Sequence, residues 1–390
     1  MRIAAVSPHF PTRALPWRGV SHDEQLRLFA EAGHDVSAVV PLPWPRPWLA
    51  GKRIPDLEHD GNIVIAHPRY PRVPRHFGGP GFALERWLFA RAAAIRLMAA
   101  VAPPDIVLAH SAALPGGLLG RIGSAGFVVS LYDHELYHSA PASPIVRRAI
   151  IRTLRSADCA VYLSEALRRS AVELAGPHRS RVIPLGIGTH TAPPGAPPRG
   201  FTVCTVGTLI PRKRVDQMIR VFARLAPERP DARLVIVGEG PERRALELMI
   251  HRLGMADKIE LTGRLDARAV QERMARASVM ALTSVRESLG AVYLEAMSLG
   301  VPALGTRGEG IEEHIEHSVS GILVPPDDDD TLLVELRALA ADPDRARRIG
   351  EEGRRRFLAG PFSWRSNAQA YLALFEELLK ERRDGTIERG

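Results

Sequence analysis

The stretch that best predicts the fold of this chain reads Arg286-Glu-Ser-Leu-Gly-Ala-Val-Tyr-Leu-Glu-Ala-Met-Ser-Leu-Gly300. It follows an apolar run, residues 279–283, that is typical of a buried strand. Ser288 is a favourable helix N-cap, and we expect a helix from about Gly290 to Leu299 that Gly300 ends. The sequence therefore predicts a strand, a tight turn and a helix.

The start of this predicted helix would attract phosphate. Its free N–H groups, on Leu289, Gly290 and Ala291, and the helix dipole both favour negative charge. Glu287 lies in the turn, and Glu295 lies roughly 7–8 Å further along the helix at ~1.5 Å per residue. One acid could meet a sugar and the other a ribose while the turn holds the phosphates between them.

The two acids and their surroundings resemble the carboxylate–seven residues–carboxylate motif of the retaining glycosyltransferases of family 4 (group 1). The Glu-Ala-Met at Glu295 belongs to that motif, and Leu289 departs from it, because the family usually has Phe there. The resemblance implies the GT-B fold, in which two doubly wound α/β domains face each other across a cleft. It also implies that Ser288, Leu289 and Gly290 bind the donor together with Glu287. The alternative is a solvated glutamate on an ordinary helix.

Length and composition predict a globular protein of two domains, since 390 residues allow two hydrophobic cores. No apolar run approaches the ~20 residues of a membrane span. The first residues read as a strand rather than as a signal peptide. Cys159 and Cys204 lie in apolar runs, which favours a cytoplasmic protein with two buried thiols.

The net charge of +8 is unevenly distributed. Residues 1–190 hold 22 Lys+Arg and 14 Asp+Glu; because the whole chain has 52 and 44, residues 191–390 hold 30 of each. The first half is therefore expected to face an acidic partner or a charged surface.

The first half opens with a β-α-β pattern, which implies a parallel sheet. Residues 2–7 and 35–40 read as buried strands, and residues 22–33 read as the helix between them. The resemblance places Gly19, at the end of the loop before this helix, near the transferred phosphate.

Residues 41–82 are rich in Pro, Arg and aromatic residues and do not read as regular helix. Two interpretations stay open. One is a long surface loop. The other is an acceptor- or lipid-facing edge with exposed aromatic residues, Trp44, Trp48, Tyr70 and Phe77.

Two later strands are predicted to end in polar side chains, where ligands of open α/β sheets collect. One ends at His110, which resembles the family histidine beside the transferred sugar; a structural histidine is the alternative. The other, residues 126–131, precedes Tyr132, Asp133 and His134, and Tyr132 takes a position where many family members have His. These side chains suit recognition of acceptor hydroxyls, and a metal cluster is the alternative.

Helices are expected at residues 82–100 and 144–156. The second is amphipathic and carries four arginines, so it either lies on an anionic membrane or buries its apolar side in the domain core. Residues 191–200, rich in Pro and Gly, read as the interdomain linker.

The second half begins with a predicted strand that ends at Gly207. Arg212 and Lys213 then resemble the basic pair by which the family holds the donor diphosphate. They suit that role because the planar guanidinium of Arg212 can donate two parallel hydrogen bonds and the ammonium of Lys213 is a compact positive charge. A solvent-facing pair at a helix start is the alternative. Thr208 and Arg214 stand where the family has its first Arg and a Gly.

Gly238-Glu-Gly240 lacks the third Gly and the ribose-binding acid of a dinucleotide fingerprint, which argues against a nicotinamide dehydrogenase. The resemblance places the nucleobase at Gly263, Arg264 and Leu265.

The acidic run 327–330 is interpreted as the start of a helix, where acids suit the dipole, rather than as a metal site.

The resemblance also divides the chain. Residues 1–190 form the acceptor-side domain and residues 201–362 the donor domain. Residues 363–390 form a helix that crosses back to the first domain, followed by a polar tail.

The implied activity is transfer of a hexose from a nucleoside diphosphate sugar to a hydroxyl, with retention, without a covalent enzyme intermediate and without an essential metal or cofactor. Glu287, Lys213, Arg212 and His110 are expected to carry the chemistry, because a departing diphosphate needs positive charge and N–H donors. Alternatives are a sugar-nucleotide epimerase and a non-catalytic sugar-nucleotide-binding partner.

The expected partners are the donor and a carbohydrate or lipid-linked acceptor of polysaccharide or glycolipid synthesis, and no nucleic acid. The expected location is the cytoplasm, with peripheral contact to the inner face of the membrane as an open question.

Overall fold

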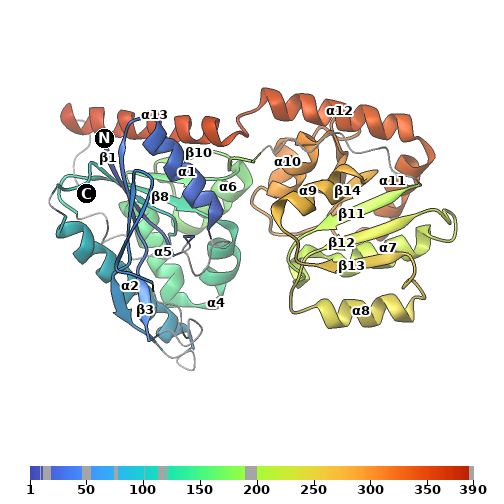
Figure 1. The fold of residues 1–390 in the computed structure, drawn as a ribbon, viewed down its shortest axis with the longest axis horizontal. Helices are drawn as coiled ribbons and strands as arrows, with labels where there is room; N and C mark the ends of the chain where they lie inside the picture. Colours follow the sequence, from blue (N-terminus) through green and yellow to red (C-terminus); the bar gives the residue numbers. More distant parts are fainter. Residues whose placement is uncertain are drawn as a thin grey trace. The chain divides into compact units, whose positions relative to one another are not determined.

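The computed structural model describes residues 1–8, 10–11, 19–45, 54–73, 78–100, 102–112, 119, 122–188 and 200–385. The chain forms two compact units, shown in Figure 1. Unit 1 comprises Met1–Gly186 and Trp364–Gly390, and unit 2 comprises Ile187–Ser363. Apart from Gly200, the predicted linker 191–200 lies outside the described residues.

Unit 1 is built on an eight-stranded sheet. Its strands lie in the order β10 (Ser180–Val182), β9 (Cys159–Tyr162), β8 (Gly126–Leu131), β7 (Ile106–Ala109), β1 (Arg2–Val6), β2 (Asp35–Val39), β5 (Ile63–Ala66) and β4 (Leu57–Asp60). Neighbouring strands are parallel except β4 and β5, which are antiparallel. The chain order reverses between β1 and β7, so the carboxyl ends of these strands form the position where such sheets bind ligands.

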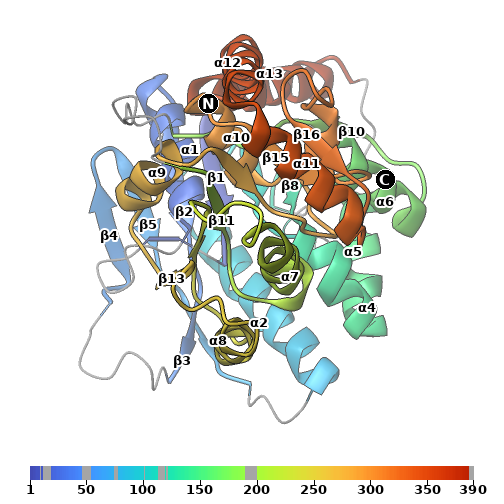
Figure 2. The ribbon, with the colours of Figure 1, turned by 90° about the vertical axis from the view of Figure 1, so that its right-hand side faces the viewer.

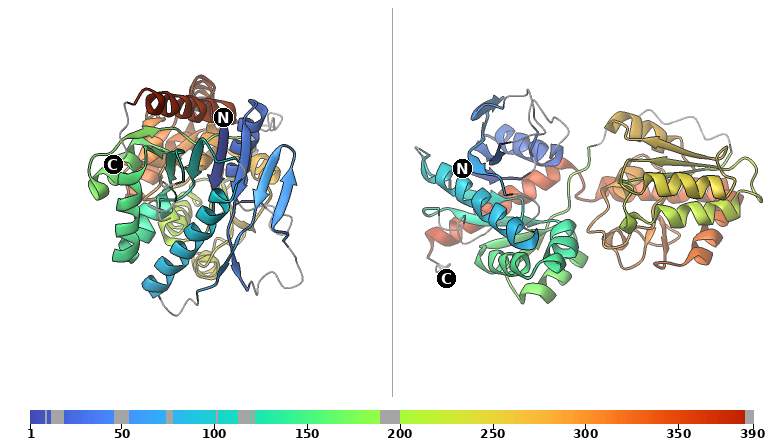
Figure 3. Two further views of the ribbon diagram at one scale, coloured as in Figure 1. Left: turned by 90° about the vertical axis from the view of Figure 1, so that its left-hand side faces the viewer. Right: turned by 90° about the horizontal axis from the view of Figure 1, so that it is seen from below.

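Helices cover both faces of this sheet (Figure 3). One face packs against α1 (Val20–Glu31) and α13 (Trp364–Arg383). The other packs against α2 (Gly78–Met98), α5 (Pro144–Ser156) and α6 (Glu165–Ala175). The helix α13 therefore completes the core of unit 1 although it follows unit 2 in the sequence.

The interpretation of residues 41–82 as a long surface loop was wrong for the described residues of this segment, whereas the acceptor- or lipid-facing edge stays a prediction. β4 and β5 form a hairpin that extends the main sheet, and β3 (Leu42–Trp44) pairs in parallel with β6 (Arg69–Pro71). Proline is tolerated in these short strands because they lie at an edge, where not every N–H is needed. α2 begins at Gly78, four residues before the predicted start.

The structure describes two of the four aromatic residues that were expected to be exposed in this segment, and one of these two is exposed. Trp44 is 63% exposed, whereas Tyr70 is buried and packs edge-on against Phe89. Trp48 and Phe77 lie outside the described residues.

The amphipathic helix α5 has the predicted bounds, Pro144–Ser156, and Ser143 caps its start by accepting the Val146 N–H. Its apolar residues Val146, Ile150 and Leu154 are buried in unit 1, and its arginines are exposed. The core-facing interpretation of the apolar side is therefore confirmed, with Ile145 as an exposed exception.

Unit 2 contains a six-stranded sheet that is parallel throughout (Figure 2). Its strands lie in the order β13 (Ile259–Gly263), β12 (Arg233–Val237), β11 (Thr202–Val206), β14 (Val279–Ala281), β15 (Ala303–Thr306) and β16 (Ile322–Val324). The chain order reverses between β11 and β14, which places the ligand-binding position of this sheet at their carboxyl ends.

The helices of unit 2 are α7 (Val215–Leu225), α8 (Arg243–Arg252), α9 (Ala267–Ala275), α10 (Ala291–Ser298), α11 (Asp329–Ala341) and α12 (Pro343–Ala359). Asp328 caps α11 by accepting the Thr331 N–H at 2.8 Å, so the acidic run is a helix start as predicted.

The N-cap of α10 is Gly290, not Ser288. Gly290 has a φ of 69°, and a Cβ there would lie 2.4 Å from the Tyr293 ring, so the turn requires glycine.

Candidate active site

Two loops of unit 2, one on each side of the β11–β14 position, bring three predicted site residues together. Lys213 follows β11 and forms an ion pair with the buried carboxylate of Glu287, which follows β14. Arg212 reaches the same carboxylate oxygen at 3.5 Å. The backbone also joins the loops, because the Val285 N–H donates to the Arg212 carbonyl at 2.9 Å. A nearly buried acid is thus held between two cations at a sheet edge suited to ligands.

The turn that carries Glu287 is held by a residue that the sequence did not reveal. Arg286 has a φ of 56°, a left-handed conformation that costs a non-glycine residue about 1–2 kcal/mol. Glu309, from the loop after β15, accepts the N–H groups of Arg286 at 2.9 Å and Glu287 at 2.6 Å. These two contacts offset the strain and fix the orientation of the turn.

The helix α10 offers donors and a second acid. Because Gly290 is its N-cap and the Tyr293 N–H already bonds to the Gly290 carbonyl, the donors without a partner among the described residues at its start are the N–H groups of Gly290, Ala291 and Val292, of which the first two were predicted. Glu295 is half-buried, and its carboxylate has no hydrogen-bond partner among the described residues. Burial raises the pKa of Glu295.

The start of α10 is fastened to the end of β14 by one buried side chain. The Tyr293 hydroxyl donates to the Leu282 carbonyl at 2.7 Å and lies 3.0 Å from the Ser284 hydroxyl. The donors of α10 and the turn at Glu287 therefore belong to one rigid arrangement.

The other predicted donor residues lie at the same edge of the sheet. Gly207 directly follows β11 and lies beside the Lys213 side chain. Gly238, after β12, has no room for a side chain, since a Cβ would lie 1.9 Å from the Gly207 carbonyl oxygen. Gly263 ends β13, and Arg264 and Leu265 follow it, on the far side of β12 from β11. The structure shows no contact between Gly263–Leu265 and Glu287.

Arg214 also has a physical explanation. It caps α7 with a φ of 52°, a conformation that glycine adopts without strain, at the position where the family motif has Gly. Its guanidinium pairs with Asp327 at 2.7 Å. Arg214 therefore serves the start of α7 and points away from the Glu287 group.

Unit 1 gathers a separate polar cluster at its own ligand-binding position. The His22 ring bonds to Ser7 Oγ through Nδ1 at 2.8 Å and to the Tyr132 hydroxyl through Nε2 at 3.0 Å. The same hydroxyl lies 3.4 Å from His110 Nδ1. Gly19, the left-handed N-cap of α1, accepts the His22 N–H and so places this histidine. Neither Ser7 nor His22 was predicted as a site residue, although Ser7 follows β1 directly and His22 lies in the first turn of α1.

The remaining predicted residues of unit 1 are not part of this cluster. His134 is exposed and turns to Ser139 at 3.3 Å, and Asp133 is half-buried. Glu135, which is buried, accepts the Ser111 hydroxyl instead. Residues 113–118, which follow His110 and belong to its family segment, lie outside the described residues.

No group of three or more residues able to bind a metal ion occurs in the part of the chain that the structure describes. Cys159 and Cys204 are free and buried, and burial raises the pKa of Cys159 to about 11 and that of Cys204 to about 12. Both thiols are therefore inert at neutral pH.

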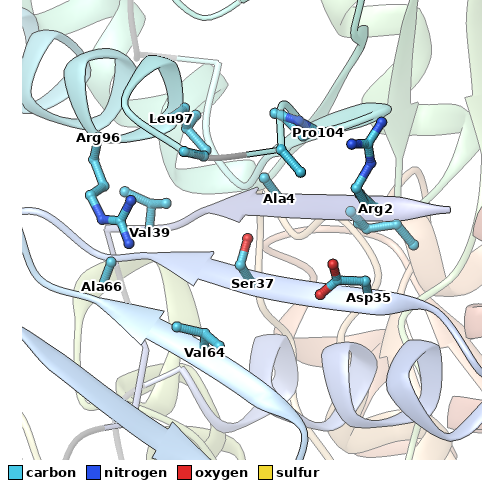
Figure 4. Close-up of a pocket in the computed structure, with 13 residues that line it drawn as sticks. Arg2, Ala4, Asp35, Ser37, Val39, Val64, Ala66, Arg96, Leu97 and Pro104 are labelled. Carbon is cyan, nitrogen blue, oxygen red and sulfur yellow. The ribbon is translucent and has the colours of Figure 1, made fainter.

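A cavity of about 230 Å³ lies between α2 and strands β1, β2 and β5 (Figure 4). Its walls carry Arg2, Asp35, Ser37 and Arg96, and none of the predicted site residues lines it. The groups that resemble a catalytic site are at the strand ends instead.

Comparisons with known proteins agree with this geometry. Residues 188–356 match the family model "Glycosyl transferases group 1", and residues 19–186 match the model "Glycosyl transferase 4-like domain". The chain is 32% identical over 292 residues to the GDP-mannose-dependent alpha-(1-6)-phosphatidylinositol monomannoside mannosyltransferase of Mycolicibacterium smegmatis, covering 70% of this chain and 74% of the relative. The chain belongs to the group 1 glycosyltransferases.

Solved structures show the fold of this group 1 glycosyltransferase. Sucrose-phosphate synthase from Thermosynechococcus elongatus has a TM-score of 0.76 at 20% identity, covering 97% of this chain and all of the synthase. Anabaena HepE, solved with UDP and glucose, has a TM-score of 0.72 at 17% identity, with the same coverage. The GT-B prediction is confirmed, and the chain is a glycosyltransferase that uses a nucleotide sugar.

Proposed function

We propose that this glycosyltransferase moves a hexose from a nucleoside diphosphate sugar to a hydroxyl acceptor with retention at the anomeric carbon. The observation that carries the proposal is the Glu287 carboxylate, held between Lys213 and Arg212 beside the free N–H groups of α10. This arrangement supports the proposal because a leaving diphosphate needs positive charge and N–H donors at its oxygens.

In the proposed reaction the bond between the anomeric carbon and the diphosphate breaks, and a bond to the acceptor oxygen forms on the same face. Because the acceptor attacks the face that the diphosphate leaves, no enzyme nucleophile is required. The acceptor proton passes to the leaving phosphate oxygen, so no enzyme base is required. Lys213 and Arg212 bind the diphosphate, and Glu287 orients the sugar hydroxyls. Glu295, which has no partner among the described residues, accepts the ribose hydroxyls. His110 supports the sugar or acceptor side.

The relative from Mycolicibacterium smegmatis suggests the donor and acceptor class to test first. Its name describes a GDP-mannose-dependent enzyme that acts on a phosphatidylinositol mannoside. We therefore propose mannose on GDP as the first donor and a lipid-linked sugar or polyol as the acceptor.

The test is a panel of GDP-mannose, UDP-glucose and UDP-N-acetylglucosamine incubated with the purified chain. The anomeric configuration of the transferred sugar is read by NMR. An α-linked product from an α-linked donor supports the proposal, and a β-linked product would contradict retention. Release of a free sugar nucleotide or free sugar with a changed configuration would identify an epimerase. Binding of the donor without turnover would identify a non-catalytic protein.

We further propose that the reaction needs no metal ion, because cations of the protein supply the counter-charge to the diphosphate. We expect full turnover in the presence of EDTA. Initial rates with EDTA, and with EDTA followed by excess Mg²⁺ or Mn²⁺, are the measurement. Activity that EDTA abolishes and the added metal restores would show that a metal is required.

Contact with a membrane is also a proposal. Among the described residues no helix has the length and apolar composition needed to cross a bilayer. Unit 1 nevertheless exposes Leu84 and Trp87 on α2, next to Arg86, and the arginines of α5. Apolar and basic side chains on one unit suit an anionic lipid surface, where a lipid-linked acceptor is found.

We expect the protein to sediment with vesicles that contain anionic lipid at low salt and to be released at ~0.5 M salt, because the Debye length then falls to a few ångströms. Replacing Arg147 and Arg148 with Glu should weaken binding roughly 10–30-fold, at ~1 kcal/mol for each basic residue. The same replacement of Arg347 and Arg348, an exposed pair in unit 2, is the matched control. Absence of binding at low salt would exclude the membrane contact, and binding that salt leaves unchanged would exclude its electrostatic basis.

A further inference from the structure

The cavity between α2 and the sheet of unit 1 has a floor of short side chains (Figure 4). Ser37 lies in the middle of β2, in register with Ala4 on β1 and Val64 on β5. Two residues further along the same face, Val39 is in register with Ala66. Register neighbours on adjacent parallel strands point to the same side of a sheet, so these side chains all face the cavity. Because three of the five are no larger than serine, space remains above the strands.

This part of the sheet is only partly covered. Ser37 and Val64 are half-buried, and Leu57, which pairs with Ala66 from the outer strand β4, is 49% exposed. Parallel sheets usually have both faces covered by helices. The residues of α2 that line the cavity, Arg96 and Leu97, come from its last turn. The cavity therefore lies at the margin of the cover that α2 gives the sheet.

One side chain in the cavity carries a charge without a counter-charge. Arg96 is half-buried, and it extends from α2 over the strands toward Val39 and Ala66 (Figure 4). It forms no ion pair or hydrogen bond with the described residues. A cation in the last turn of α2 suits the helix dipole, which explains the charge of Arg96 but not its direction over the sheet. The Ser37 hydroxyl, also without a partner among the described residues, faces the same space.

The other charges at the cavity are placed differently. Arg2 is held by Asp105 in an ion pair of 2.8 Å, and Asp105 also accepts the backbone N–H of Arg2 at 2.7 Å. Asp35, an exposed residue in register with Arg2, adds a negative charge at the opposite end of the cavity from Arg96 (Figure 4). The cavity is therefore positive at Arg96 and negative at Asp35.

These features favour a small monocarboxylate as the ligand. A guanidinium binds a carboxylate through two parallel hydrogen bonds, and a serine hydroxyl can donate a third. A second anionic group would approach Asp35 and be repelled, and a phosphate dianion would bring two charges to one free cation. Val39, Val64 and Leu97 offer an apolar surface to the rest of the molecule. The cavity of about 230 Å³ is smaller than the ~300–1,000 Å³ of typical ligand pockets, so that apolar part is short.

We propose that this cavity binds a small monocarboxylate with a short apolar body, and that the carboxylate lies between the Arg96 guanidinium and the Ser37 hydroxyl. The proposal goes beyond the transfer reaction. None of the residues that line the cavity belongs to the Glu287 group or to the polar cluster of unit 1. It gives unit 1 a ligand site apart from those of the donor and the acceptor.

The first test is titration of the purified chain with benzoate and with hexanoate, read by ligand-observed NMR. We expect saturable binding of at least one. The neutral amides of both acids, the dicarboxylate adipate and phenyl phosphate should bind at least tenfold more weakly, the factor of one hydrogen bond to a charged group. Equal binding of acid and amide, preference for phenyl phosphate or adipate, or absence of saturable binding by both monocarboxylates would overturn the proposal.

The same titration with variants identifies the cation. Arg96→Gln should lower the affinity for the carboxylate about 10–100-fold. Arg96→Lys keeps the charge but not the planar fork, so its loss should be smaller. Arg91→Gln, at an exposed position of the same helix, is the matched control and should keep the wild-type affinity. Unchanged affinity in Arg96→Gln, or an equal loss in Arg91→Gln, would overturn the proposal.

The second test locates the ligand while Arg96 stays in place. Val64→Cys puts a thiol in the cavity, and the native cysteines are both buried. The carboxylate at ten times its Kd should slow the modification of this thiol by iodoacetamide about tenfold, by mass action. Ser156→Cys, at the exposed end of α5, is the control and should react at one rate with and without the carboxylate.

Neither readout depends on turnover, so failure of the proposed transfer would leave this test valid. Absence of protection in Val64→Cys, or equal protection of the thiol in Ser156→Cys, would overturn the proposal. Protection should also persist when GDP or UDP is added. Loss of protection on addition of the nucleotide would mean that the carboxylate occupies the donor site, and would overturn the assignment of a separate site.

Discussion

Lys213→Ala is expected to lower kcat by about 10²–10³-fold, which corresponds to the loss of ~2.7–4 kcal/mol of transition-state stabilisation by one preorganised group. In the free protein Lys213 is paired with Glu287, so the charge is already desolvated and oriented before the donor binds. Arg212→Ala should act in the same direction, because the guanidinium reaches the same carboxylate at 3.5 Å. The measurement is single-turnover transfer at saturating donor, which separates the chemical step from binding.

The control for Lys213→Ala is Arg224→Ala, which removes a cation from the exposed end of α7, where Arg224 pairs with Asp330. This variant should keep the wild-type rate. Because Lys213 and Glu287 contact each other, the double variant Lys213→Ala/Glu287→Gln should lose less than the product of the two single losses. Wild-type kinetics in purified Lys213→Ala would remove this residue from the site.

Glu287→Gln and Glu295→Gln are expected to separate transfer from nucleotide binding. Glu287 lies in the turn beside the cations, so its change should chiefly slow transfer, by about 10²-fold or more. Glu295 lies along α10, and its loss should chiefly weaken the binding of the free nucleoside diphosphate. The expected loss of affinity is about 10–100-fold, the range of a hydrogen bond to a charged group. Calorimetric titration with GDP and UDP is the measurement, and Glu272→Gln on the exposed side of α9 is the control.

The pH dependence gives a second measurement of Glu295. Burial raises its pKa, so the carboxylate takes up a proton at a higher pH than an exposed glutamate does. The protonated group accepts ribose hydroxyls less well. Nucleotide affinity should therefore fall as the pH is lowered towards the raised pKa, and this fall should be absent in Glu295→Gln. If Glu287→Gln lost the nucleotide affinity and Glu295→Gln kept it, the two roles would be reversed.

Local sequence signals predicted the regular elements well. β8 and α5 have the predicted bounds because an apolar run that only Ser130 interrupts and a Ser-Pro helix start leave few alternatives. The segment 41–82 was misjudged because its prolines obscured short strands that need partners from elsewhere in the chain. Choosing Ser288 as the cap of α10 failed because the turn puts Gly290 in the left-handed conformation at the N-cap, where the Tyr293 ring leaves no room for a Cβ.

The site was only partly predictable for a related reason. Glu287, Lys213 and Arg212 carry a motif, so their approach could be expected. Glu309 is 22 residues from the Glu287 N–H it accepts, and His22 is 110 residues from Tyr132. Contacts of this kind depend on the order of strands in the sheet, which a single sequence does not specify.

The position of α13 also affects how the protein is made. Tyr371 and Phe375 are fully buried and lie 6.3 and 5.7 Å from Phe29 of α1, ring centre to ring centre. A nascent chain therefore exposes this apolar face of unit 1 until residues 364–383 have left the ribosome, after all of unit 2 has been synthesised. We expect unit 2 to become protease-resistant first during synthesis, and residues 1–186 expressed alone to need a chaperone or to aggregate.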